Sequence, residues 1–123
     1  MMTFRTSVRQ SGDVAILDIA GRIVLGDGSK EMRNRIAELV NAGHKKILLN
    51  LAEVSYVDSS GLGELVSSYS NVTNAGGKIK LVNVQPKVAD LLKITKLYSV
   101  FESFSSEGSA VASFVENQQA ASA

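Results

Sequence analysis

Residues 54–65 read VSYVDSSGLGEL, and they bring a carboxylate, two hydroxyls and two glycines together between a strand-like run and a helix-like run. Side chains of these types could act as a serine nucleophile, as part of a phosphate-binding loop, or as an acceptor that is itself phosphorylated. The three chemistries require different neighbours, and the rest of the sequence shows which neighbours are present.

The spacing of the glycines argues against a phosphate-binding loop. Gly61 and Gly63 follow a strand and open a helix, as in a dinucleotide-binding loop, but Val66 stands where that fingerprint has its third glycine. Asp58 would also place a carboxylate beside the bound pyrophosphate. The pattern G-x-x-x-x-G-K-[ST] of a Walker A loop occurs nowhere in the 123 residues.

A serine nucleophile would lack a base. His44 is the only histidine, and its setting in AGHKK is typical of an exposed loop. The chain has no cysteine, so a thiolate nucleophile, a disulfide and a cysteine metal site are excluded, and one histidine cannot make a multi-histidine metal centre. We therefore expect no catalytic residue, no metal and no cofactor.

The position of the serines fits a phosphorylation site. Ser59 or Ser60 is expected to cap a helix that begins near Gly61, where unpaired backbone N–H groups and the helix dipole favour negative charge. A phosphate there would join Asp58 in a negative patch that repels a partner without unfolding the protein. Gly61 and Gly63 are expected to keep the approach open to a kinase. From the residues alone, a phosphorylation switch and a plain helix cap are equally good interpretations of these serines.

The elements that position this loop follow from the hydrophobic periodicity. A hairpin turns at residues 11–13, a helix capped by Asp27 or Ser29 follows, and residues 45–54 form a strand buried on both faces. Another helix, a strand at 78–84, a helix from Pro86, a short edge strand within 98–104 and a helix from 106 or 107 complete the chain. The order β-β-α-β-α-β-α-β-α predicts one α/β domain with a mixed sheet of about five strands and about four helices.

Composition limits the class of partner and the compartment. Thirteen basic and twelve acidic residues leave a formal charge of +1, which gives no support for direct nucleic-acid binding. No run approaches the ~18 apolar residues of a membrane span, and the N-terminus lacks the apolar stretch of a signal peptide, so a cytoplasmic protein is expected. Residues 1–116 are expected to form the domain, and the small polar residues 117–123 a disordered tail.

The stretch VSYVDSSGLGEL resembles the phosphorylation loop of the STAS domain family, named for sulfate transporters and anti-sigma factor antagonists. The chain is most similar to the free-standing antagonists, and the resemblance extends over the hairpin, KKILLNLAEVSYVDSSGLG, NAGGKIKLVNV and LLKITKLYSVFESF. It implies a STAS-like fold and a partner-switching regulator of transcription, not an enzyme.

The resemblance also implies roles for particular residues. The serine directly after the aspartate, Ser59, would be phosphorylated by an anti-sigma factor with serine kinase activity, with Ser60 as the alternative acceptor. The unphosphorylated form would bind that anti-sigma factor, and a serine phosphatase acting on the phosphorylated form would restore binding. The implied partner-binding loop comprises Asp58, Ser59, Ser60, Gly61, Leu62 and Gly63. A second contact loop near it would comprise Val24, Leu25, Gly26, Asp27, Gly28 and Ser29.

One departure from the family pattern leaves the partner open. Many antagonists carry an acidic residue soon after the early glycine, whereas Gly21 is followed here by Arg22, Ile23 and Val24, and the region is about one residue longer. A scaffold subunit of a larger signalling assembly and a soluble accessory subunit of a membrane transporter remain alternatives within the family. The sequence does not decide between a monomer and a dimer.

Overall fold

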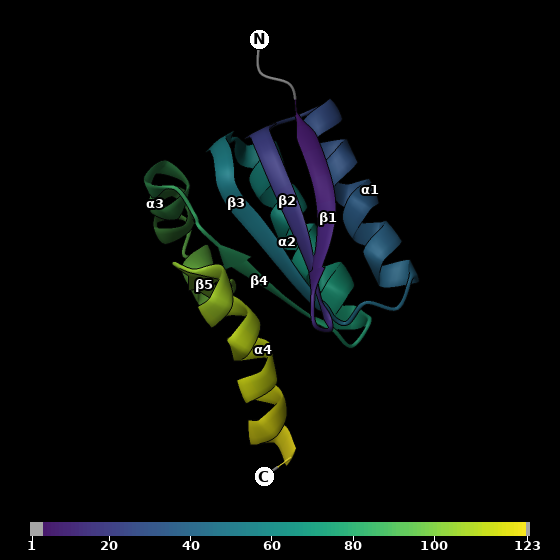
Figure 1. Cartoon of the computed structure of the whole chain (residues 1–123). Coiled ribbons are helices and arrows are strands. Elements are labelled where there is room, and N and C mark those ends of the chain that lie inside the picture. The colour runs from purple at the N-terminus through teal and green to yellow at the C-terminus, as the bar shows by residue number, and fades with distance from the viewer. Residues whose placement is uncertain (1–3, 123) are drawn as a thin grey trace.

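The computed structural model of the chain describes the backbone of residues 4–122 and, apart from residue 27 and residues 116–122, their side chains. The elements are β1 (Arg5–Ser11), β2 (Val14–Ile23), α1 (Asp27–Asn41), β3 (Lys46–Val57), α2 (Ser59–Asn74), β4 (Lys78–Val82), α3 (Pro86–Ile94), the 3-10 helix η1 (Leu97–Ser99), β5 (Ser103–Phe104) and α4 (Glu107–Ser122) (Figure 1). The predicted order of strands and helices is confirmed, with η1 as an addition. Of the strand expected within 98–104, only two residues pair with the sheet.

The five strands form one mixed sheet in the order β1-β2-β3-β4-β5. β1 and β2 are the antiparallel hairpin, and the pairs β2–β3, β3–β4 and β4–β5 are parallel, as predicted. Because parallel strands end at the same edge of a sheet, the segments that follow β2 and β3 meet at that edge. This edge carries both loops singled out in the sequence.

The core is divided between the two faces of the sheet. Ile47, Leu49 and Leu51 of β3 belong to a large cluster with α1, α2 and α3, whereas Leu48 belongs to a smaller cluster with α4. Figure 1 shows α1 and α2 behind the sheet and α4 in front of it. β3 is therefore buried on both faces, which explains its nearly continuous apolar sequence.

The start of α1 differs from the prediction. Neither Asp27 nor Ser29 is the N-cap: Gly26 takes that position with φ 106°, and no side chain accepts a hydrogen bond there. The hydroxyl of Ser29 donates instead to the carbonyl of Val24 at 2.7 Å. At the other end, Gly43 follows the helix with φ 93°, a left-handed conformation that favours glycine just after a helix.

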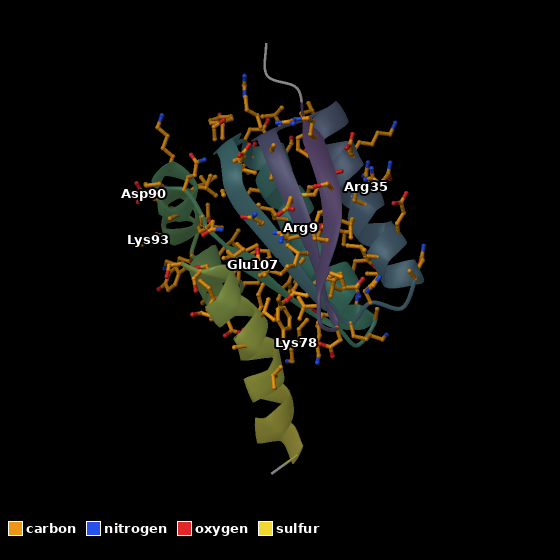
Figure 2. The ribbon with its side chains drawn as sticks, viewed as in Figure 1. Arg9, Arg35, Lys78, Asp90, Lys93 and Glu107 are labelled. Atoms are coloured by element: carbon orange, nitrogen blue, oxygen red, sulfur yellow. The ribbon has the colours of Figure 1, made fainter. Side chains whose placement is uncertain are left out.

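A polar cluster lies on the sheet beside the first turn of α4. Arg9 of β1 donates to both carboxylate oxygens of Asp18 and, at 2.8 Å, to Glu107 (Figure 2). Asn50 adds a hydrogen bond of 2.8 Å to Asp18. These contacts, led by Arg9, lower the pKa of Asp18 below its ordinary value against an opposing effect of burial.

The C-terminal helix begins at Glu107, as predicted. The tail expected at 117–123 lies outside the residues whose side chains are described, and the domain boundary at 116 stays a prediction. None of the described helices combines the length and the apolar composition that crossing a membrane requires.

Candidate functional site

The candidate site lies where β3 ends and α2 begins. Asp58 has extended backbone angles and is the N-cap of α2, so the prediction that Ser59 or Ser60 caps the helix is wrong. Its Oδ1 accepts the backbone N–H of Gly61 at 2.7 Å, and its carbonyl accepts the N–H of Leu62 at 2.8 Å. Aspartate caps helices as well as serine does, and here it is the residue that directly follows the strand.

Asp58 also connects the two loops. Its Oδ2 accepts the backbone N–H of Leu25 at 3.2 Å, and its own N–H donates to the carbonyl of Ile23, also at 3.2 Å. The predicted second contact loop is therefore held against the predicted partner-binding loop by one carboxylate.

The same contacts set the charge of Asp58. The N–H of Gly61 has the largest effect in lowering its pKa, and the N–H groups of Leu25 and Ser60 and the charge of Arg22 act in the same direction. Desolvation opposes them with a smaller effect. Asp58 is thus an anion at neutral pH.

The two serines differ in exposure. Ser59, the first residue of α2, is exposed, whereas Ser60 is half-buried and lines a hollow between α1 and α2. Neither hydroxyl has a hydrogen-bond partner within the part of the chain that the structure describes. Of the two, Ser59 is the more accessible to another protein.

The two glycines of the loop have different roles. Gly61 is buried, and a Cβ added to it would lie 2.0 Å from the carbonyl oxygen of Ile23. A Cβ on Gly63 would meet nothing within 4 Å. Gly61 therefore permits close packing of α2 on the end of β2 and does not serve to keep the approach open, whereas for Gly63 that role stays a prediction.

Part of the predicted second contact loop is packed inside the fold, and part of it is exposed. Gly28 is buried, and a Cβ there would lie 2.8 Å from the carbonyl oxygen of Arg22. Val24 is half-buried, Leu25 is 78% exposed, and the side chain of Asp27 lies outside the described residues. Leu25 is therefore the prominent apolar side chain of this loop.

An open hollow of about 430 Å³ lies between the start of α1 and the first turns of α2. Its lining comprises Leu25, Gly26, Ser29, Lys30, Arg33, Ser60 and Glu64. Lys30, Arg33 and Glu64 are not among the site residues predicted from the sequence. Lys30 and Arg33 could have been found from their spacing of three residues, which puts them on one face of the helix that follows the loop.

The charged groups around the hollow are unequally exposed. Arg33 Nη1 lies 3.7 Å from Glu64 Oε1, and the side chains of these residues are 57% and 13% exposed. The guanidinium of Arg22 lies over the ring of Tyr56 at 5.4 Å from its centroid. Basic side chains thus lie both at the hollow and close enough to Asp58 to affect its pKa.

His44 cannot serve either serine as a base. It precedes β3, and the serines follow it, so all twelve residues of that strand lie between them. At about 3.3 Å per residue, such a strand spans roughly 40 Å. Among the described residues, no group of three or more histidine, cysteine, aspartate or glutamate side chains could hold a metal ion.

Known proteins share the sequence pattern of this chain over most of its length. The family model of the STAS domain matches residues 5–110. The anti-sigma-B factor antagonist of Bacillus subtilis (strain 168) is 32% identical over 108 residues, which are 87% of this chain and 97% of that protein.

Solved structures share the fold. A crystal structure from Thermotoga maritima, of a protein provisionally named an anti-sigma factor antagonist, has a TM-score of 0.81 at 25% identity and covers 88% of this chain and 92% of that one. The anti-sigma factor antagonist SpoIIAA in its unphosphorylated form has a TM-score of 0.68 at 16% identity, over 93% of this chain and 98% of that one. A structure of SpoIIAA from Bacillus in the phosphorylated form has the same TM-score, 0.68, at 18% identity, over 91% and 99% of the two chains.

Proposed function

The chain belongs to the STAS domain family, and we propose that it is an anti-sigma factor antagonist that switches partners when Ser59 is phosphorylated. In its unphosphorylated form it binds a cytoplasmic anti-sigma factor that is also a serine kinase. Phosphorylation of Ser59 by that kinase ends the binding, and a serine phosphatase restores it. The name of the Bacillus subtilis relative, which matches over nearly its whole length, supports this role.

The accessibility of Ser59 carries the proposal. Its side chain is exposed at the first position of α2, and no hydrogen bond within the described part of the chain has to break before its hydroxyl can react. Ser60, the alternative acceptor, is half-buried. A kinase can therefore reach Ser59 without unfolding the helix.

The neighbouring Asp58 determines what a phosphate at Ser59 would do. Asp58 already accepts the N–H of Gly61 at the start of the helix, so the phosphate gains little from the helix end. It adds a charge of about −1.5 to −2 beside an ionised carboxylate. The result is a concentrated negative patch in solvent, which leaves the core unchanged and repels a partner docked there.

The proposal is tested with the purified chain, ATP and each serine-kinase anti-sigma factor of the same genome. We expect mass spectrometry to find one phosphate, on Ser59, that is absent from Ser59→Ala and retained in the matched control Ser60→Ala. The phosphorylated chain is expected to bind its anti-sigma factor at least a hundredfold more weakly, which corresponds to about 3 kcal/mol. Failure of every kinase to modify Ser59, or equal affinity of the two forms, would refute the switch.

A further inference from the structure

Some of the described charged side chains around the serine loop already have partners within the protein, whereas others remain available to a ligand. Both carboxylate oxygens of Asp58 accept backbone N–H groups, and the side chain of Glu64 is only 13% exposed. Lys30 is exposed and has no ion pair within the described residues, and Arg33 is 57% exposed, with a long contact of 3.7 Å to Glu64. Among the described side chains, the charge left available at the hollow is positive.

The other walls of the hollow add an apolar surface and a free hydroxyl. Leu25 is 78% exposed, although an isolated loop gains nothing by presenting a leucine to water. Ser60 lines the hollow, and its hydroxyl has no partner in the described structure. A cation pair, a hydroxyl and an apolar wall together suit a side chain with a carboxylate at the end of an aliphatic stem.

We propose that this hollow receives an acidic side chain of the anti-sigma factor and that Lys30 and Arg33 select it. This inference rests on the proposed function and names the chemistry of its partner. The carboxylate would accept hydrogen bonds from both basic side chains and from Ser60, while Leu25 covers its stem. Arg33 would exchange a long contact with Glu64 for a shorter one with the partner.

The same arrangement links docking to phosphorylation. Ser59 precedes Ser60, so its phosphate would lie at the rim of the hollow, close to the cations that the carboxylate needs. A dianion there offsets the positive charge and repels the incoming acid. For this chain, the contact with the partner and the response to phosphate would depend on the same two basic residues.

The test compares variants that lose equal charge in different places. K30Q/R33Q removes two cations at the hollow, and the control K78Q/K93Q removes two exposed cations elsewhere, from the start of β4 and from the end of α3 (Figure 2). Affinity is measured for the anti-sigma factor that phosphorylates the wild type, at low and at physiological salt. Circular dichroism melting checks that each variant is folded.

We expect K30Q/R33Q to bind about tenfold more weakly and with less dependence on salt, and the control to bind within about twofold of the wild type. Glu64→Gln, which releases Arg33 without changing the shape of the side chain, should bind roughly twofold to fivefold more tightly, an effect that a folding defect cannot mimic.

Two results overturn the inference: K30Q/R33Q binding as tightly as K78Q/K93Q, or Glu64→Gln binding no more tightly than the wild type. Both leave the proposed function intact, since the wild type still binds and is modified. A wild type that binds no anti-sigma factor and takes no phosphate at Ser59 overturns both proposals together, so the two failures are distinguishable.

Discussion

Gly61→Ala is predicted to push the start of α2 away from the end of β2. Gly61 is buried at the third position of the helix, and the nearest atoms to an added Cβ are the carbonyl oxygen of Ile23 at 2.0 Å and its carbonyl carbon at 2.8 Å. These are backbone atoms at the end of β2, which cannot rotate aside as a side chain would. The helix must therefore move, and it carries Ser59 with it.

The magnitude follows from the size of the overlap. Ordinary van der Waals contact begins near 3.4 Å, so the helix has to shift by about 1.4 Å. Overpacking of this kind costs up to about 3 kcal/mol, and the better helix propensity of alanine recovers about 1 kcal/mol. A net loss of about 2 kcal/mol lowers the melting temperature of a domain of this size by roughly 8 °C.

Gly63→Ala is the matched control, because it is the same substitution two residues later in the same helix. A Cβ there meets nothing within 4 Å, so only the gain in propensity remains, and Tm should rise by about 2 to 4 °C. Thermal unfolding followed by circular dichroism measures both variants, and the rate of Ser59 phosphorylation reports the displaced loop. Equal Tm values for the two variants, or a lower value for Gly63→Ala, would refute the packing argument.

Two further predictions concern the carboxylates. Because Arg9 holds the pKa of Asp18 below its ordinary value, this carboxylate stabilises the fold above its unfolded pKa near 4 and stops doing so as the pH falls through its lower folded pKa. The extra stability of the wild type over Asp18→Asn in urea unfolding at about pH 7 should therefore shrink below about pH 4; an unchanged difference at low pH would contradict this. Asp58→Asn keeps only one acceptor oxygen for the N–H groups of Gly61 and Leu25, so hydrogen exchange measured by NMR should accelerate at one of them, and unchanged protection of both would contradict the double contact.

The order of the elements was predictable because its signals are local. Gly12 and Asp13 join two runs with strand composition, the run from Ile47 to Leu51 is apolar on both faces, and Pro86 suits the first turn of a helix. Once strands and helices alternate, short right-handed crossovers make the strand pairs parallel. None of these steps needs information about distant parts of the chain.

The details that depend on tertiary contacts were not predictable. Asp58, Ser59 and Ser60 are all good helix caps, and the choice among them depends on where β3 leaves the sheet. Residues 98–104 have strand composition, yet the left-handed turn at Lys96, with φ 62°, leads into η1 and leaves only two residues to pair. Lys80 is another such case: it is 2% exposed, because α4 covers it and Ser113 accepts a hydrogen bond from it at 2.9 Å.

The geometry of Asp58 also bears on how a phosphate at Ser59 would act. Asp58 holds the start of α2 through Gly61 and the loop after β2 through Leu25, and Gly61 in turn packs directly against Ile23. With both oxygens engaged and no space between Gly61 and the end of β2, the backbone of this corner has little freedom to rearrange. A phosphate on an exposed neighbour can still change the surface charge. The proposed switch is therefore better explained by a reversal of charge on a rigid docking surface than by a change of its shape, and the partner must be sensitive to that charge.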